Sequence, residues 1–292
     1  MNRIVSALLI IIPFHAATAS AAFAQTPERV TFDSADGKVK LVGYLYLPDA
    51  KIFPSPRPAV VMLHGRSGVY SSIAKRYDET TLASRTTLWG KFWAERGYVG
   101  LYVDTFGPRG YPQGFAAGTN DGSRPLEINE ITVRPFDAYM GLKYLRGRAD
   151  VRKDQVYLQG WSNGGSATLS TMEERTPGME KPTPASGFRA AIAVYPACTP
   201  VTKHYGKTFR SYAPVLLLIG TEDEEVSYPN CVKLADGSRA GDVEFVSYPG
   251  AQHSYDTPIG KRQAVAANVE ATQDTLRRAE EFLRKFVARP EK

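Results

Sequence analysis

The stretch that decides the fold is residues 156–165, which read Val-Tyr-Leu-Gln-Gly-Trp-Ser-Asn-Gly-Gly. Its apolar start is typical of a short buried strand, and the small residues that follow suit a helix packed closely against that strand. Between them, Gly160, Ser162 and Gly164 fit the pattern G-x-S-x-G, in which a serine lies on a sharp turn from strand to helix. The pattern predicts Ser162 as a nucleophile at a helix N-terminus, and a glycine-rich turn without chemistry is the alternative.

Apolar runs alternate with helical patterns on both sides of this stretch. This alternation implies parallel strand pairing through right-handed crossovers, so we predict a doubly wound α/β domain with helices on both faces of the sheet. Catalytic groups should then lie at the carboxyl ends of the strands. We expect strands at residues 30–34, 41–47, 58–63, 98–103, 156–159, 190–195, 215–219 and 243–248, and helices at 81–96, 131–148, 163–175, 232–239 and 265–287.

A serine nucleophile needs a base, and the chain has 4 histidines, the first of them in the N-terminal apolar segment. Chains with this motif carry their catalytic residues in the order serine, acid, histidine. His64 precedes Ser162, and His204 precedes the best acid candidate. His253 follows the expected strand at 243–248, so we predict it as the base; a loop histidine without a role is the alternative.

The acid should orient the imidazole of the base and stabilise its charged form. Asp223 follows the apolar run 215–219 in the segment Gly-Thr-Glu-Asp, and we predict it as the acid. Its neighbours Glu222, Glu224 and Glu225 are close competitors, and a solvated acidic turn is the alternative. Asp256 comes after the base and breaks the expected order.

Hydrogen-bond donors are needed for the oxyanion that forms on attack. One expected donor is the backbone N–H of Asn163, directly after the nucleophile, and the other comes from the turn after the strand 58–63. In that turn we choose the N–H of Arg66, with Gly65 as second choice. We expect His64 to pack or hydrogen-bond beneath this loop.

Composition excludes several classes of protein. The chain has 292 residues, of which 43% are hydrophobic and 23% charged, which argues against disorder and against a coiled coil. The net charge is +6, but basic and acidic residues are interspersed, so a nucleic-acid partner is not expected. No metal-binding or dinucleotide motif is present in the sequence, and we expect neither a metal nor a cofactor.

Residues 1–24 have the pattern of a signal peptide. Arg3 precedes an apolar run at 4–12, and Ala22-Phe23-Ala24 gives the small-x-small cleavage pattern. An uncleaved anchor is the alternative, but the apolar run is shorter than the ~20 residues of a membrane span. We therefore expect an exported protein, periplasmic or secreted and without a stable membrane anchor, whose residues 25–292 form a single domain.

Export changes the expected state of the 2 cysteines. In an oxidising compartment two thiols are usually paired, so we predict a disulfide between Cys198 and Cys231. Two buried free thiols are the alternative.

Five segments of the chain together match a known family: Val-Val-Met-Leu-His-Gly at 60–65, Gly-Trp-Ser-Asn-Gly-Gly at 160–165, Gly-Thr-Glu-Asp at 220–223, Gly-Ala-Gln-His-Ser-Tyr at 250–255 and Tyr-Val-Asp-Thr-Phe-Gly-Pro-Arg-Gly at 102–110. On these segments the chain resembles the dienelactone hydrolase family of the α/β-hydrolase superfamily from about Val30 to Phe286. The resemblance implies a mostly parallel sheet of about eight strands without a large lid domain, with Ser162 as nucleophile, His253 as base and Asp223 as its partner.

Two departures from the family pattern bear on function. The namesake enzyme has a cysteine nucleophile where this chain has Ser162, and it has a glutamate where this chain has Gly65. We therefore predict a general serine carboxylester hydrolase acting on a small-molecule ester through an acyl-enzyme. A peptidase-like hydrolase on the same fold and a non-catalytic extracytoplasmic binding protein are the alternatives.

Arginines in the loops after the strands could bind a substrate carboxylate through a bidentate fork. Arg66, Arg109 and Arg134 are the candidates. Arg134 and Asp137, three residues apart at helical spacing, are expected to form an intrahelical or helix-to-loop pair instead. Arg109 follows the strand 98–103 and is the substrate-binding residue we predict.

Overall fold

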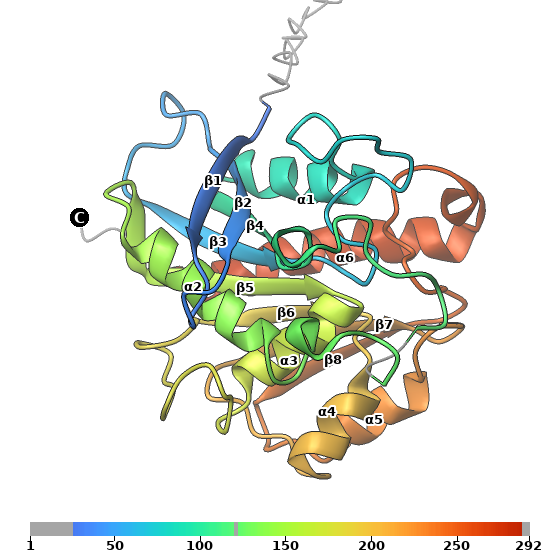
Figure 1. Ribbon diagram of the computed structural model, residues 1–292. Helices are drawn as coiled ribbons and strands as arrows, with labels where there is room; N and C mark the ends of the chain where they lie inside the picture. The colour runs from blue at the N-terminus through green and yellow to red at the C-terminus, as the bar shows by residue number, and fades with distance from the viewer. Residues whose placement is uncertain (1–25, 120–121, 288–292) are drawn as a thin grey trace, which may run out of the picture.

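The computed structural model describes residues 26–119 and 122–287. An eight-stranded sheet runs through the molecule in the order β1-β2-β4-β3-β5-β6-β7-β8 (Figure 1). The α/β fold and the strand number are thus confirmed. The strands are β1 (Glu28–Asp33), β2 (Lys40–Tyr46), β3 (Arg57–Leu63), β4 (Val99–Asp104), β5 (Val151–Trp161), β6 (Ala191–Val194), β7 (Val215–Gly220) and β8 (Val243–Tyr248).

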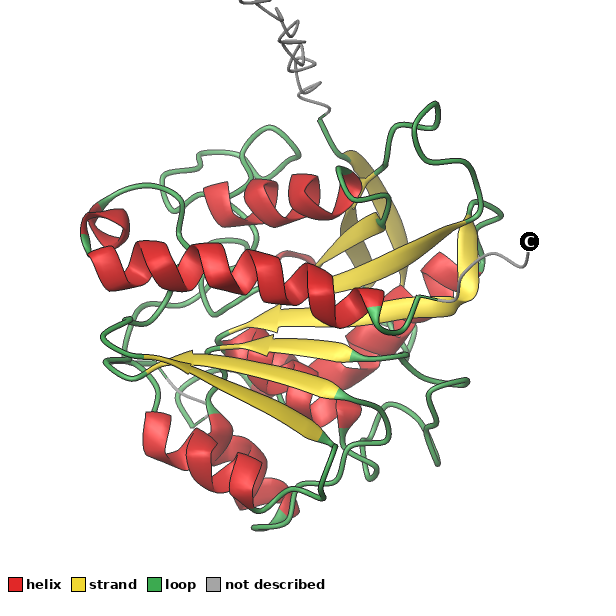
Figure 2. Cartoon of the chain, turned by 180° about the vertical axis from the view of Figure 1, so that it is seen from behind, coloured by secondary structure: helices red, strands yellow, loops and turns green. Residues whose placement is uncertain are grey.

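The direction of the strands follows from their connections. β1 and β2 form an antiparallel hairpin, and β2 pairs antiparallel with β4 at that edge of the sheet. From β4 to β8 every neighbouring pair is parallel. The carboxyl ends of these strands therefore share one edge, as the arrowheads in Figure 2 show.

Helices cover both faces of the sheet. α1 (Ser84–Ala94) and α6 (Ala266–Arg284) lie on one face, in front of the strands in Figure 2. α2 (Arg134–Arg146), α3 (Asn163–Met172), α4 (Cys198–Tyr205) and α5 (Tyr228–Asp236) lie on the other. Right-handed crossovers account for this division, because the chain reverses its direction across the sheet after β4.

The central strands are buried on both faces, as their continuous apolar sequences predict. Every residue of β4, β6 and β7 is buried. At about 25 cal/mol per Å² of apolar surface removed from water, this core is the main source of the fold's stability. The carboxyl edge of the sheet is thus a rigid base for the loops that follow the strands.

Several elements differ from their predicted bounds. β5 begins at Val151 rather than 156, and Val151 already pairs with Arg57. The apolar pattern missed this start because polar, partly exposed residues follow Val151. The helix α4 (Cys198–Tyr205) was not predicted. The loop after β4 contains two short 3₁₀ turns, Gly107–Arg109 and Leu126–Ile128, and a third, Lys261–Ala264, precedes α6.

The predicted signal peptide, residues 1–24, lies outside the described residues. Within the part of the chain that the structure describes, no helix is both long and apolar enough to cross a membrane.

Candidate active site

Ser162 lies on the turn between β5 and α3 in a conformation that L-residues rarely adopt, with φ 54° and ψ −118°. Its N–H donates to the carbonyl oxygen of Val194 on the neighbouring strand (2.9 Å). The turn is possible because Gly160 and Gly164 lack a side chain: a Cβ atom would lie 2.2 Å from the Gly164 carbonyl oxygen in the first case and 2.1 Å from that of Leu63 in the second. The strained backbone of Ser162 therefore places the hydroxyl group at the N-terminus of α3.

His253 follows β8 and reaches back over the sheet edge to Ser162. The Ser162 hydroxyl lies 2.9 Å from Nε2 of the imidazole, and Nδ1 lies 2.8 Å from Oδ2 of Asp223. Because the carboxylate can only accept, Nδ1 carries the proton and Nε2 is left to accept the serine hydroxyl proton. The His253 side chain is 2% exposed, so this chain of hydrogen bonds is shielded from water.

The loop after β7 brings Asp223, rather than its acidic neighbours, to Nδ1 of the imidazole. Its Oδ1 accepts the backbone N–H groups of Glu225 and Val226 (2.9 Å each), which leaves Oδ2 directed at His253. Glu224 accepts the N–H of His253 (3.1 Å) and pairs with Arg262. The structure thus brings Ser162, Asp223 and His253 together, as the order along the chain predicts.

The turn after β3 lies directly against the nucleophile. A Cβ atom at Gly65 would lie 3.5 Å from the Cβ of Ser162, an ordinary van der Waals contact, so the backbone of this turn is in the immediate neighbourhood of Ser162. The peptide of Arg66 is fixed by the N–H of Phe115, which donates to its carbonyl oxygen (2.8 Å). The first N–H groups of α3, including that of Asn163, have no partner within the helix. Both predicted oxyanion donors therefore belong to segments that border Ser162.

His64 supports this turn from below, as predicted. The N–H of Thr105 donates to its Nε2 (3.1 Å), and its Nδ1–H donates to the carbonyl oxygen of Gly65 (2.7 Å). Burial, together with the nearby Arg134 charge, holds the pKa of His64 well below its ordinary value, outweighing the hydrogen bond to Gly65. His64 is therefore a neutral supporting group rather than a second base.

Arg134 is fully buried, and the predicted pair with Asp137 does not form. Its guanidinium donates to the carbonyl oxygen of His64 (2.8 Å) and to the side-chain oxygen of Asn163. It thereby ties the turn after β3 to the start of α3. The prediction of an intrahelical or helix-to-loop pair rested on helical spacing, whereas the partners of Arg134 lie in the turn after β3 and at the start of α3.

Arg109 is also engaged within the protein. Its two terminal nitrogens form a bidentate pair with Asp137 (2.8 and 2.9 Å), and one of them also donates to the carbonyl oxygen of Thr105 (2.7 Å). The fork that we expected to bind a substrate carboxylate is therefore taken by a buried carboxylate of α2. Arg109 could bind a substrate carboxylate, as predicted, only by displacing Asp137.

Glu225 extends the set of charged groups at the imidazole. Its carboxylate accepts two hydrogen bonds from Arg66 (3.0 and 2.8 Å), and its Oε2 lies 3.7 Å from Nε2 of His253. Partial burial would raise the pKa of Glu225, but the hydrogen bonds from Arg66 and the positive charge of its guanidinium lower it below its ordinary value. Glu225 is thus an ionised neighbour of the predicted base.

Asp256 is a buried carboxylate that sequence reasoning set aside. It accepts hydrogen bonds from Arg85 (3.0 Å), Trp89 (2.8 Å), Trp161 (2.9 Å) and the hydroxyl of Tyr195 (2.5 Å), and it is 1% exposed. These donors come from α1 and from the ends of β5 and β6. The sequence offered one signal, its position shortly after His253. Its hydrogen-bond donors are far away in sequence, so no local pattern could reveal them.

The same network reaches both ends of the serine–histidine pair. Trp161 directly precedes Ser162, and the Tyr195 ring lies edge-on against the imidazole of His253, with 4.9 Å between ring centroids. Asp256 therefore contacts Trp161 and Tyr195, which are the neighbours of Ser162 and His253.

The predicted disulfide between Cys198 and Cys231 is confirmed. It joins α4 to α5, the helix that follows the loop carrying Asp223. A bridge of this kind typically stabilises the folded state by ~2–4 kcal/mol.

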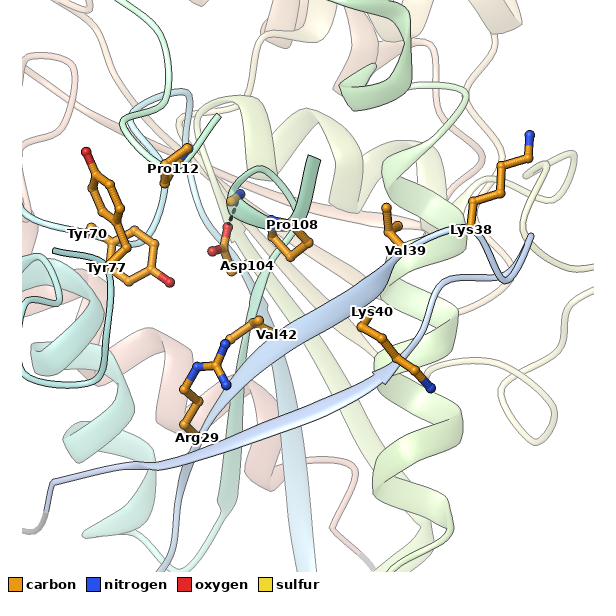
Figure 3. Close-up of a pocket in the computed structure, with 11 residues that line it drawn as sticks. Arg29, Lys38, Val39, Lys40, Val42, Tyr70, Tyr77, Asp104, Pro108 and Pro112 are labelled. Carbon is orange, nitrogen blue, oxygen red and sulfur yellow. Dashed lines mark hydrogen bonds between the residues drawn. The ribbon is translucent and has the colours of Figure 1, made fainter. Parts of the chain in front are cut away.

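A cavity of about 510 Å³ lies beside the β1–β2 hairpin (Figure 3). Asp104, Tyr70 and Tyr77 line it, with Arg29 of β1 at its border. None of Ser162, Asp223 and His253 lines this cavity, so it is separate from the cluster around the nucleophile.

Comparisons with known proteins identify a family and several solved structures with a similar fold. Residues 41–287 match the model of the dienelactone hydrolase family. Esterase 2 of Thermogutta terrifontis, phosphorylated by paraoxon, superimposes with a TM-score of 0.62 at 19% identity, covering 92% of this chain and 97% of that one.

Two further structures show the same fold. The propionate-bound form of that esterase has a TM-score of 0.61 at 18% identity, covering 92% of this chain and 98% of that one. A protein described as a dienelactone hydrolase of Klebsiella pneumoniae subsp. pneumoniae has a TM-score of 0.62 at 17% identity, covering 89% of this chain and 100% of that one.

Proposed function

Since the chain belongs to the dienelactone hydrolase family and is a carboxylester hydrolase, we propose that it cleaves small-molecule esters through a serine acyl-enzyme, with Ser162, His253 and Asp223 as its triad. The observation that carries this proposal is the unbroken pair of hydrogen bonds from Ser162 through the imidazole to Asp223. The strained turn at Ser162 supports it, because such strain persists where function requires it.

The first half of the reaction forms the acyl-enzyme. His253 Nε2 takes the hydroxyl proton of Ser162 while Oγ attacks the ester carbonyl carbon, and the carbonyl electron pair moves onto oxygen. The N–H groups of Asn163 and Arg66 are proposed to bind that oxyanion, and Asp223 stabilises the imidazolium. The tetrahedral intermediate then collapses, and the departing alkoxide takes the proton from Nε2.

The second half repeats these steps with water. His253 takes a proton from the water molecule, whose oxygen attacks the acyl carbon, and collapse returns the proton to Ser162 Oγ. The products are the carboxylic acid and the free enzyme. No group beyond this chain and water is required for the balance of atoms.

Ester hydrolysis tests the proposal directly. The wild-type protein should hydrolyse p-nitrophenyl acetate, and Ser162→Ala should lower kcat by roughly 10⁴–10⁶-fold, as triad knockouts do. Ser166→Ala is a matched control, because Ser166 is a buried serine of α3 whose hydroxyl lies 3.3 Å from the carbonyl oxygen of Ser162 and contacts no triad side chain. A wild-type rate in Ser162→Ala would rule out the mechanism. Peptide substrates in the same assay distinguish an esterase from a peptidase, and complete inactivity of the wild type would favour a binding protein.

We also propose that the protein is exported after removal of residues 1–24. The disulfide supports this, because such bonds persist in oxidising compartments. N-terminal sequencing of the protein from its native host should give Gln25 as the first residue, and an intact N-terminus on the mature protein would contradict cleavage.

A further inference from the structure

The arginines around the candidate site are all engaged by groups of the protein itself. Arg109 is held by Asp137, and Arg134 by the His64 carbonyl oxygen and Asn163. Arg66 donates to both carboxylate oxygens of Glu225. A substrate carboxylate would therefore have to displace an existing partner in order to bind any of these three.

The acidic groups outnumber the basic ones beside the imidazole. Asp223, Glu224 and Glu225 face the guanidinium groups of Arg66 and Arg262, so these five side chains place one net negative charge beside the imidazole. Burial of Asp223 and partial burial of Glu225 limit the screening of this charge by water. The immediate surroundings of the base thus repel a second anion.

Glu225 lies close to the imidazole nitrogen that would protonate the leaving alcohol of an ester. Its Oε2 lies 3.7 Å from Nε2 of His253, the same nitrogen that lies 2.9 Å from the Ser162 hydroxyl. In an acyl transfer this nitrogen gives its proton to the leaving alcohol oxygen. The departing group therefore comes within a few ångströms of the Glu225 carboxylate.

We propose that Glu225 sets the charge preference of the leaving group: the site accepts esters of uncharged or cationic alcohols and disfavours esters of anionic ones. This inference rests on the proposed esterase function. Glu225 is a specificity residue on the alcohol side, and the Arg66 side chain holds its carboxylate in place instead of binding substrate.

Three acetate esters of matched shape test this preference. They are acetylcholine, the analogue in which carbon replaces the ammonium nitrogen, and the analogue that ends in a sulfonate. All three form the same acetyl-enzyme, so differences in kcat/KM report the acylation step, in which the alcohol leaves. Comparing each ester between the wild type and a variant removes the intrinsic reactivity of the ester.

Glu225→Gln should raise kcat/KM for the sulfonate ester relative to the uncharged ester by about fivefold, and lower it for acetylcholine on the same scale. This is the size expected for one charge at short range in a partly hydrated site. Glu222→Gln is the matched control, since it removes the same charge from an exposed residue of the same loop and should leave the ratios unchanged. Arg66→Gln should shift the ratios in the opposite direction to Glu225→Gln.

The outcomes separate this inference from the proposed function. Turnover of the uncharged ester by the wild type tests the esterase, and only the ratios test Glu225. Ratios unchanged in Glu225→Gln, or a sulfonate ester favoured by the wild type and lost in Arg66→Gln, would overturn the inference. The second result would mean that the substrate anion displaces Glu225 from Arg66. Titration of the reactive serine with paraoxon corrects every rate for the folded fraction.

Discussion

Among the carboxylates near the candidate base, Asp223 and Asp256 differ most clearly in their surroundings, and the difference separates a proposed catalytic residue from a structural one. Asp223 has one oxygen held by two backbone N–H groups and the other directed at His253. Asp256 has both oxygens saturated by side-chain donors from three other elements. The first can respond to a change of charge on the imidazole, whereas the second is fixed in a buried network.

This difference predicts separate consequences for the two residues. Substitution of Asp223 should remove activity and leave the fold intact, because its backbone donors remain partly hydrated in their loop. Substitution of Asp256 should weaken the fold first and activity only through it.

The largest expected effect follows from Asp223→Asn. The amide can donate to Nδ1, which favours the imidazole tautomer with its proton on Nε2, and that tautomer cannot accept the Ser162 proton. We expect kcat to fall by about 10³–10⁴-fold, by analogy with serine–histidine–aspartate triads. Urea unfolding should show a change of no more than ~1 kcal/mol. A variant that retains more than a tenth of wild-type kcat would remove Asp223 from the triad.

Asp256→Asn should show the opposite balance. An amide offers one acceptor oxygen in place of two and turns N–H groups toward donors, and it leaves the Arg85 charge without its buried partner. We expect a loss of ~3 kcal/mol in the free energy of unfolding, measured by urea denaturation. The rate per titrated serine should fall less than tenfold. Full stability combined with a complete loss of activity would reverse the assignment of the two aspartates.

Removal of the disulfide tests how the loop of Asp223 is supported. Cys198→Ala combined with Cys231→Ala should lower the free energy of unfolding by ~2 kcal/mol, because the chain loses a cross-link between α4 and α5. The triad contacts do not involve either cysteine, so kcat should change by less than about threefold. A loss of activity as large as that of Asp223→Asn would show that the bridge positions the acid.

Burial of His64 predicts that the stability of the protein depends on pH. His64 has a depressed pKa in the folded state, so the unfolded chain binds its proton more readily, and stability falls as the pH drops below the ordinary value of about 6.5. The loss of unfolding free energy due to His64 reaches ~1 kcal/mol near pH 5.5. His64→Asn will be less stable at every pH, but its stability should fall by ~1 kcal/mol less between pH 7.5 and 5.5. Equal pH dependence in both proteins would show that His64 takes up its proton as readily in the folded state as in the unfolded chain.

Sequence reasoning reached those parts of the site that depend on local geometry and chain order. Gly160 and Gly164 mark the turn of Ser162 because their lack of a side chain has a direct steric cause. The order of serine, acid and histidine singled out Asp223 and His253, which the structure brings into contact with Ser162 by hydrogen bonds. The parallel sheet followed from buried apolar runs separated by helical patterns.

The partners of the arginines could not be predicted in this way. Arg66 and Glu225 are 159 positions apart along the chain, and no local pattern links them. Arg134 was assigned to Asp137 because the two share a helix, yet Arg109, 28 positions away, takes that carboxylate. Such contacts depend on side-chain directions at the edge of the folded sheet, which sequence periodicity does not encode.

Reaction with paraoxon followed by peptide mass spectrometry tests the central claim most directly. An activated Ser162 should attack phosphorus and expel p-nitrophenolate, leaving one diethylphosphoryl group on the peptide that contains residues 160–165, with activity lost in proportion to labelling. Labelling should be absent in Ser162→Ala and strongly slowed in His253→Ala. A wild-type protein that hydrolyses esters but is labelled elsewhere, or an unaltered labelling rate in His253→Ala, would contradict the account.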